Sequence, residues 1–275
     1  MPTLPQLMSR CLAAVPYAWR ARVKRVPVVG AMQRWVTSAA LDGRPFVHLS
    51  DAGPARGIRF LVQLPEDKGI WTGTYEADFA VAVAAAVRPG AVCYDIGGWH
   101  GYFAAIMAAQ GAGAVHVFEP LPGNGDRIAR LAALNPQVAI HLHRMAIGDR
   151  DGEVELRLMP ESSMAKIADS PFQPDMTAAE SIRVPLARLD TLVTAGTIPP
   201  PDLIKLDLEG AELLALHGAL DVLGRHRPVI FAEVHSPALL SGCEGLLAAA
   251  GYRTSAIART DDGSGGPVHI CAAAV

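Results

Sequence analysis

Short apolar runs alternate with longer amphipathic stretches through the last two thirds of this 275-residue sequence. Apolar runs of strand length lie at 91–95, 114–118, 138–143, 202–207 and 228–235. Stretches with helical periodicity follow them, at 102–110, 126–134, 211–223 and 237–250. Because short apolar strands separated by helices pair in parallel with both faces covered, this pattern predicts an α/β fold with a doubly wound, Rossmann-like sheet. Two further strands, 252–258 and 267–274, predict an antiparallel C-terminal hairpin.

The region before the first of these strands follows a different pattern. Residues 45–50 and 58–64 predict a short strand pair, and apolar residues every four positions predict a helix over 75–88, with Thr74 as its N-cap. We therefore expect an N-terminal helical and β extension over 1–72 and a sheet domain over 73–275.

The sheet domain contains an insertion at about 151–190. Turn residues predict a hairpin around Gly152, and a polar stretch follows it. Long irregular segments at strand ends often form lids, so Ser162, Ser163 and Lys166 are candidate substrate contacts.

Composition and charge narrow the class of protein. Hydrophobic residues make up 51% of the chain and charged residues 19%, which excludes a disordered chain. The net charge of −3 provides no global positive field, so we expect no nucleic-acid partner. Residues 1–44 carry seven cations and one anion, a charge of +6, which leaves −9 for the remainder. This basic leader either packs as a solvated helical face or makes weak peripheral contact with a membrane.

Membrane and compartment signals point to a chain without a transmembrane span. Residues 96–118 carry no Asp, Glu, Lys or Arg, but two histidines and five glycines interrupt the run, which favours a loop, helix and strand. The N-terminus has no signal-peptide pattern. The four cysteines are widely spaced without a CxxC pair, so we expect no disulfide scaffold, no structural zinc and a cytoplasmic location.

Candidate chemistry begins at the ends of the first two strands of the sheet domain, where open parallel sheets bind their ligands. Asp95 ends the first strand, and a loop with Gly97, Gly98 and Gly101 follows it. Glycines let the backbone turn and approach a ligand closely, and the next helix presents its positive N-terminus. Glu119 ends the second strand, 22 residues after Gly97, where a carboxylate can accept hydrogen bonds from ribose hydroxyls. These residues together predict a nucleoside cofactor.

Two details favour S-adenosylmethionine over a dinucleotide. The glycine loop lacks the G-x-G-x-x-G spacing. A carboxylate two residues before the first glycine, Asp95, repels phosphate but suits a sulfonium or ammonium charge. A dinucleotide-dependent oxidoreductase nevertheless remains an open alternative.

The ends of the remaining strands carry further acidic residues, and with them the sequence matches the pattern of a known family. The chain resembles the FkbM-type family of class I S-adenosylmethionine-dependent methyltransferases over about residues 70 to 255. The matching segments are Gly73-Thr74-Tyr75-Glu76, Asp95-Ile96-Gly97-Gly98 with Gly101-Tyr102-Phe103, Phe118-Glu119-Pro120, Ala146-Ile147-Gly148-Asp149, Leu189-Asp190-Thr191-Leu192, Lys205–Glu212, and Arg227-Pro228 with Glu233. The resemblance implies a seven-stranded, mostly parallel sheet and O-methylation of a hydroxyl. One position departs from the family pattern, which has Asn where this chain has Trp99.

The resemblance also suggests roles for single residues. The expected cofactor-binding residues are Glu76, Asp95, Gly97, Gly98, Trp99, Gly101, Glu119, Pro120, Ala146, Ile147 and Asp207. Some of these residues could instead have a purely structural role. Trp99 could simply pack, and Asp95 could cap a helix. Acidic residues in the first turn of a helix could act only through the helix dipole, which applies to Glu76, Glu209 and Glu212.

Three residues are candidates for the acceptor chemistry. Asp207 follows the fourth strand and could orient the acceptor hydroxyl or take its proton. Glu233 and His235 share one side of the fifth strand, and His235 is a candidate base. A divalent cation on these three residues is possible but not favoured.

The acceptor expected from the resemblance is a small molecule or glycan, namely a sugar hydroxyl or a secondary metabolite. The alternative is a cofactor-binding protein without catalytic activity, in which Trp99 blocks the pocket. The sequence indicates neither the acceptor's identity nor the oligomeric state.

Overall fold

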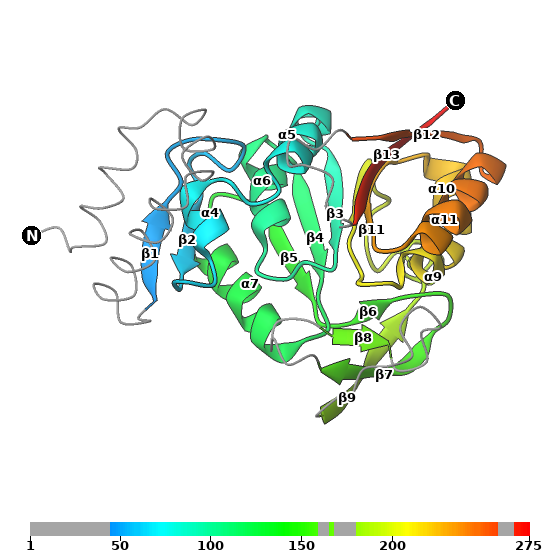
Figure 1. The fold of residues 1–275 in the computed structure, drawn as a ribbon, viewed down its shortest axis with the longest axis horizontal. Helices are drawn as coiled ribbons and strands as arrows, with labels where there is room; N and C mark the ends of the chain where they lie inside the picture. Colours follow the sequence, from blue (N-terminus) through cyan, green and yellow to red (C-terminus); the bar gives the residue numbers. More distant parts are fainter. Residues whose placement is uncertain (1–44, 159–164, 168–179, 258–266) are drawn as a thin grey trace, which may run out of the picture.

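The computed structural model describes residues 45–158, 165–167, 180–257 and 267–275. The basic leader, Ser162 and Ser163 lie outside the described residues. The chain forms a central sheet with helices on both faces, a two-stranded ribbon at one side and a smaller sheet below (Figure 1). Within the described residues, no helix is both long and apolar enough to cross a membrane.

The central sheet has seven strands in the order β12-β13-β11-β10-β3-β4-β5. They are β3 (Val92–Ile96), β4 (Ala114–Phe118), β5 (Ile140–His143), β10 (Leu203–Leu206), β11 (Val229–Val234), β12 (Tyr252–Ala256) and β13 (Val268–Ala274). Strands β5, β4, β3, β10 and β11 pair in parallel, whereas β13 pairs antiparallel with both β11 and β12. The predicted α/β class, the mostly parallel seven-stranded sheet and the C-terminal hairpin are confirmed.

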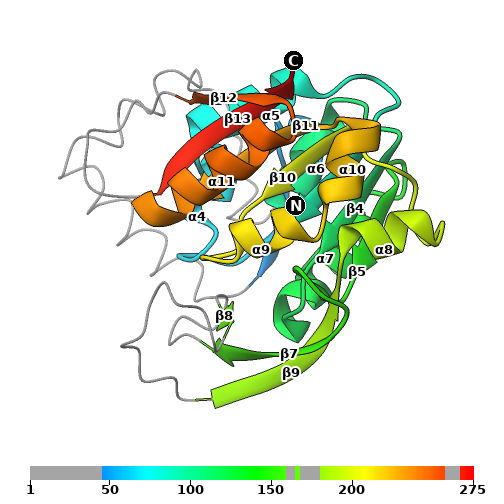
Figure 2. The ribbon, with the colours of Figure 1, turned by 90° about the vertical axis from the view of Figure 1, so that its right-hand side faces the viewer.

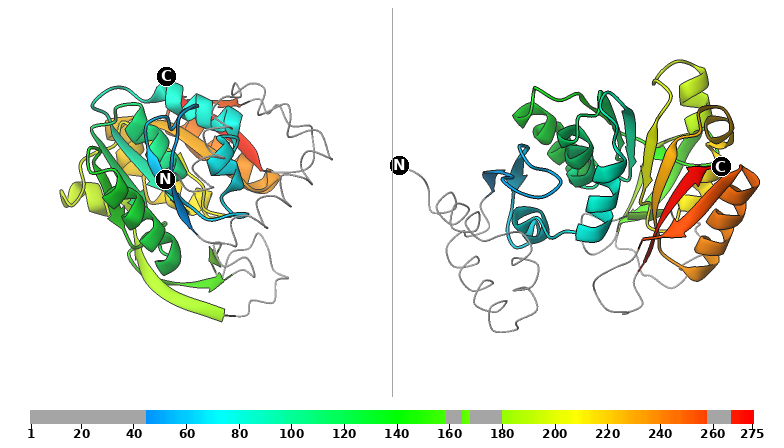
Figure 3. Two further views of the ribbon diagram at one scale, coloured as in Figure 1. Left: turned by 90° about the vertical axis from the view of Figure 1, so that its left-hand side faces the viewer. Right: turned by 90° about the horizontal axis from the view of Figure 1, so that it is seen from above.

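Helices cover both faces of this sheet, which makes it doubly wound (Figures 2 and 3). One face carries α5 (Ala77–Ala86), α6 (Tyr102–Ala109) and α7 (Pro122–Leu134), with Phe79, Ile106 and Ile128 in its core. The other carries α8 (Leu189–Thr194), α9 (Glu212–His217), α10 (Leu220–His226) and α11 (Pro237–Ala249), with Leu216 and Leu247 in its core. Because both faces are buried, the inner strands β3, β4, β10 and β11 consist mostly of apolar residues.

A small unit precedes the central sheet. The predicted strand pair forms, with β1 (Phe46–Leu49) antiparallel to β2 (Arg59–Val62), and a short helix, α4 (Lys68–Thr72), follows. The Asn135 side chain at the end of α7 binds both the backbone N–H and the C=O of Arg59, each at 2.8 Å. This pair of bonds attaches the ribbon to the helix layer.

The insertion, together with the preceding residues 146–147, forms a second sheet rather than the hairpin predicted around Gly152. Its strands are β6 (Ala146–Ile147), β7 (Gly152–Leu158), β8 (Ala165–Ile167) and β9 (Glu180–Ala187), in the order β6-β9-β7-β8. Strand β9 pairs with both β6 and β7 and so separates the two strands that flank the Gly152 turn. The hairpin prediction was therefore wrong, because a strand distant in sequence takes the neighbouring position.

Three helix predictions need correction. The helix predicted from residue 126 begins at Pro122, since proline fits the first helical position. The helix predicted over 211–223 is broken at Gly218, whose added Cβ would lie 1.9 Å from the Gly148 carbonyl oxygen. Thr74 caps no helix, because α5 begins after Glu76, which has a left-handed φ of 40°.

Candidate functional site

The candidate site lies at the edge of the central sheet where β3, β4, β10 and β11 end. Parallel strands bring their carboxyl ends to the same edge. Strand β13 runs the other way, so it begins there. Side chains far apart in sequence, from Asp95 to His269, therefore meet along one edge.

The loop after β3 approaches its neighbours so closely that two positions accept only glycine. Gly97 has a φ of 80°, and an added Cβ would lie 1.8 Å from the Asp207 carbonyl oxygen. An added Cβ at Gly98 would lie 2.2 Å from a methyl carbon of Val117. The glycines thus allow the loop to pack directly on the ends of β4 and β10.

Trp99 occupies the next position with a φ of 46°, a left-handed conformation that Asn adopts far more readily than Trp. This gives a physical reason for the Asn in the family pattern. The indole ring stacks on Tyr75, with centroids 5.2 Å apart, and on His100 at 3.8 Å. The stacking of the three rings offsets part of the free-energy cost of the strained backbone at Trp99.

Glu119, the predicted ribose ligand, holds the same loop. Its carboxylate accepts hydrogen bonds from the backbone N–H of Trp99 at 2.9 Å and of Leu121 at 2.8 Å. The residue is 4% exposed, and burial raises the pKa of its carboxyl group to about 7 against the effect of these hydrogen bonds. Its role toward ribose stays a prediction.

A buried lysine pairs with two of the strand-end carboxylates. Lys205 is 2% exposed, and its Nζ lies 3.5 Å from Asp95 Oδ1 and 3.2 Å from Asp207 Oδ2. Burial alone would lower the lysine pKa, but the carboxylates raise it, so the ammonium stays charged. The other Asp95 oxygen accepts the N–H of Ala104 in the first turn of α6, so this carboxylate also has the capping role that the sequence left open.

His235 lies among four carboxylates. Its Nδ1 lies 3.0 Å from Glu212, and its Nε2 lies 3.5 Å from Glu209 and 3.8 Å from each of Asp207 and Glu233. Burial would lower the pKa of the imidazole, but Glu212, Glu209 and Asp207 raise it to about 9. At neutral pH this ring is therefore protonated on both nitrogens and carries a positive charge.

Glu212 and Glu209 act beyond a helix-dipole interaction. Glu212 is fully buried and accepts the N–H groups of Leu208 and Gly210, each at 3.1 Å. It thereby fixes the loop after β10 and orients His235. Glu209 in this loop has a left-handed φ of 51°.

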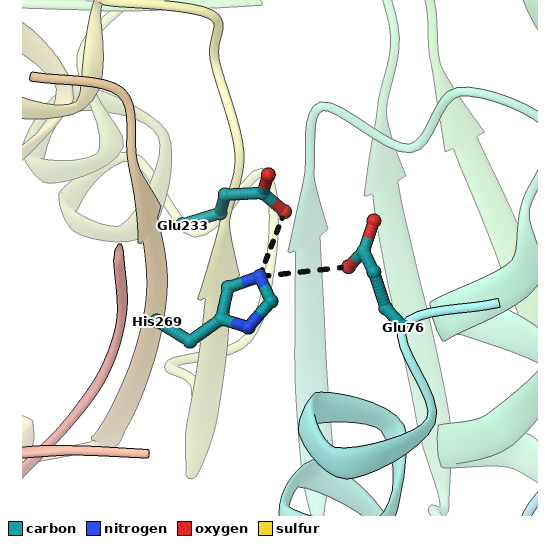
Figure 4. A group of neighbouring side chains, drawn as sticks. All are labelled: Glu76, Glu233 and His269. Carbon is teal, nitrogen blue, oxygen red and sulfur yellow. Dashed lines mark hydrogen bonds and ion pairs between the residues drawn. The ribbon is translucent and has the colours of Figure 1, made fainter. Parts of the chain in front are cut away.

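Next to this group, Glu76, Glu233 and His269 face one another across the sheet edge (Figure 4). His269 Nε2 lies 3.1 Å from Glu233 and 3.9 Å from Glu76. Burial and the charges of Glu233 and Asp207 raise the pKa of Glu76 to about 8. For Glu233, burial raises the pKa, but the hydrogen bond from His269 outweighs it and the net shift is downward.

Other predicted residues lie at the margin of this edge or elsewhere. Ala146 and Ile147 form β6 and are buried, and Pro120 directly follows Glu119 at the end of β4. Lys166 lies in β8, opposite Arg157. His141 and His143 lie two residues apart in β5, and a third ring, His116, stacks against both.

The sequence reasoning assigned no role to several residues that the structure brings into the site. Lys205 is a cation inside an apolar strand, and a buried lysine requires a charged partner. His269 stands opposite Glu233 in the register of β13 and β11. Tyr75 and His100 pack on Trp99, a contact for which the sequence contains no signal.

Comparison with known proteins identifies the family to which this sequence is similar. The family model described as the methyltransferase FkbM domain matches residues 94–254. The hexuronic acid methyltransferase AglP of Haloferax volcanii is 27% identical over 145 residues, which cover 53% of this chain and 56% of that protein. The crystal structure of the methyltransferase FkbM from Methylobacillus flagellatus KT superposes with a TM-score of 0.51 at 16% identity, over 74% of this chain and 52% of that one. The chain thus spans little more than half the length of either relative, and the structural similarity supports the fold alone.

Proposed function

This chain belongs to the methyltransferase FkbM family, and we propose that it transfers a methyl group from S-adenosylmethionine to a hydroxyl group of a sugar or sugar acid. The family is one of class I methyltransferases, which implies S-adenosylmethionine as the methyl donor. The observation that carries the proposal is the acidic sheet edge beside a glycine loop. Asp95, Asp207 and Glu233 end three neighbouring strands there.

The residues at this edge fit a cationic nucleoside cofactor. Glu119 would hold the ribose, and the loop of Gly97 and Gly98 would line the nucleoside. Asp95 Oδ1 is buried and lies 3.5 Å from the Lys205 ammonium, which Asp207 shares, so the two carboxylates together leave a net negative charge that suits a positively charged group nearby. When bound, S-adenosylmethionine supplies a methyl group on a positively charged sulfur.

The same residues disfavour a dinucleotide. A pyrophosphate binds the free N–H groups at a helix N-terminus. Here the Asp95 carboxylate already accepts the N–H of Ala104 in the first turn of α6, at 3.0 Å. A second anion at this position would meet a carboxylate whose charge is only partly compensated, because Asp95 shares the Lys205 ammonium with Asp207.

The acceptor side is assigned to Asp207, Glu233 and His235. Burial raises the pKa of Asp207 even though Lys205 opposes it, so this carboxylate is a stronger proton acceptor than an exposed one. Asp207 would take the hydroxyl proton as the oxygen–methyl bond forms and the methyl–sulfur bond breaks, which leaves a neutral thioether. His235 and Glu233 would position the hydroxyl beside it.

The sugar acceptor rests on one relative, since AglP is named as a hexuronic acid methyltransferase. The chain matches 56% of that protein, so its substrate is used here only to choose the first acceptors to test.

A methyl-transfer assay tests the proposal. Radiolabelled S-adenosylmethionine would be incubated with glucuronic acid glycosides, neutral glucose glycosides and macrolide-like alcohols. We expect label in a sugar, and we expect Asp207→Asn to lower kcat by about 10²–10⁴. Asp221→Asn, which changes an exposed carboxylate on α10, should leave kcat unchanged. Tight cofactor binding without transfer to any hydroxyl would favour a cofactor-binding protein without catalytic activity.

A further inference from the structure

Three ligating side chains form a set that overlaps the residues assigned to methyl transfer, because Glu233 belongs to both and Glu76 is an expected cofactor contact. Glu76 precedes α5, Glu233 lies near the end of β11, and His269 lies at the start of β13. Each offers one atom that lies within 4.8 Å of the other two. Figure 4 shows the two carboxylates approaching the Nε2 side of the imidazole from opposite elements.

The fold holds these three side chains in place. His269 is 4% exposed, and its ring stacks on Phe79 with centroids 4.2 Å apart and planes 12° apart. It is also the register partner of Glu233 across β13 and β11. Glu76 has a left-handed φ of 40°, a strained conformation of the kind that recurs at functional sites.

One oxygen in this group lacks the partner that its burial demands. Glu76 Oε2 is inaccessible to water and accepts no hydrogen bond from the described residues. The His269 Nε2 atom lies 3.9 Å from this oxygen, beyond hydrogen-bond distance. A buried carboxylate oxygen without a donor costs free energy unless a cation compensates it.

The distances suit a metal ion. Bonds of about 2.2 Å place neighbouring ligands of an octahedral ion about 3.1 Å apart. The separation between His269 Nε2 and Glu233 Oε2 is 3.1 Å, the separation between His269 Nε2 and Glu76 Oε2 is 3.9 Å, and all three ligand atoms lie within 4.8 Å of one another. We propose that Glu76, Glu233 and His269 bind a divalent cation, with Mn²⁺ as a suitable ion because it accepts both carboxylate and imidazole ligands.

The neighbouring set of Asp207, Glu233 and His235 is the weaker alternative. Its donor atoms also lie within 4.8 Å of one another. The Lys205 ammonium lies 3.2 Å from Asp207, and His235 lies beside four carboxylates that favour its protonated form. In that set the Lys205 ammonium and the His235 ring already lie beside Asp207, whereas Glu76 Oε2 has no hydrogen-bond donor among the described residues.

The purpose of the ion rests on the proposed function, although its binding does not. Strand β11 lies on the acceptor side of β10, away from the cofactor loop. Three protein ligands leave coordination positions open for acceptor oxygens. A bound cation would admit an acidic sugar into an otherwise acidic site and lower the pKa of its hydroxyl group.

Binding of Mn²⁺ alone tests the site, without cofactor or sugar. The full chain would be stripped with a chelator and titrated with Mn²⁺, with the free ion followed by electron paramagnetic resonance. We expect one ion per chain, and at least about tenfold weaker binding in Glu76→Gln and His269→Gln. His235→Gln distinguishes the neighbouring set, and Glu209→Gln removes a nearby charge without removing a proposed ligand. Both controls should bind within about threefold of the wild type, and circular dichroism would establish that each variant is folded.

The outcomes separate this site from the proposed function. No binding to the wild type at millimolar Mn²⁺ overturns the site, as does equal binding by wild type and His269→Gln. A loss in His235→Gln as large as that in His269→Gln also overturns the assignment. Mn²⁺ binding that depends on His269 supports the site even if no sugar is methylated, and methyl transfer by a protein that binds no Mn²⁺ leaves the proposed function intact.

Discussion

Replacing Gly97 with alanine tests whether the close contact between this loop and the end of β10 requires a residue without a Cβ atom. An alanine Cβ at this position would lie 1.8 Å from the Asp207 carbonyl oxygen, far inside van der Waals contact. Neither group can easily move, because the Asp207 N–H donates to the Ile96 carbonyl at 3.0 Å and Lys205 donates to the Gly97 carbonyl at 3.1 Å. The substitution therefore forces a backbone shift in the site.

Gly90 offers a matched control for the magnitude. Its φ of 80° equals that of Gly97, but an added Cβ there meets nothing within 4 Å. The left-handed conformation costs an alanine about 1–2 kcal/mol, so Gly90→Ala should lose about that much stability. Gly97→Ala carries the same cost and an overpacking cost of about 1–3 kcal/mol in addition. The expected loss for Gly97→Ala is thus about 2–5 kcal/mol.

Urea unfolding at 25 °C, followed by tryptophan fluorescence, measures both losses. Gly97→Ala should be less stable than Gly90→Ala by at least about 1 kcal/mol, the lower end of the overpacking cost. Equal stabilities of the two variants would refute the reasoning, because the steric cost is the sole difference between them in this account.

Two further predictions concern stability away from the cofactor loop. Asp67 is buried and receives hydrogen bonds from Gln63, His100 and Arg127. In urea unfolding, Asp67→Asn should therefore cost about 3–5 kcal/mol of stability, whereas Glu66→Gln at the exposed neighbour should cost less than about 1 kcal/mol. Similar losses in the two variants would contradict the stabilising role of the buried network. Burial and the charges of His143 and His141 lower the pKa of His116 from 6.5 to about 4, so the unfolded chain binds more protons between these values and stability falls as the pH drops through that window. Near pH 5 the His116 contribution should be about 1.2 kcal/mol per pH unit, and a pH series of unfolding curves for His116→Phe should be shallower than the wild-type series by that slope.

The sequence predicted the central sheet well because each buried parallel strand is an apolar run. Such a run can be recognised locally, without knowing which strand it pairs with. It failed where a distant contact decides the local structure. Gly218 breaks a helix because it packs on the Gly148 carbonyl, and β9 displaces the expected hairpin. Gly125 precedes the helix predicted from residue 126 but lies within α7, where an added Cβ would lie 2.5 Å from an Arg144 side-chain nitrogen.

The site was partly predictable for the same reason. Asp95, Glu119, Asp207, Glu233 and His235 stand at strand ends, and topology alone brings such positions to one edge. The pairing of charges at that edge depends on burial. Burial and the surrounding charges determine which carboxylates Lys205 neutralises and why the pKa of His235 rises to about 9, and no local pattern encodes them.

The measurement closest to the central claim is the affinity for S-adenosylmethionine, determined by titration calorimetry on the full chain. We predict one molecule bound per chain, and Glu119→Gln should bind at least about tenfold more weakly, because hydrogen bonds to a charged carboxylate contribute about 1.5–3 kcal/mol. Glu153→Gln, at an exposed position in β7, serves as the control and should bind like the wild type. Binding of a nicotinamide dinucleotide with no heat from S-adenosylmethionine would contradict the account.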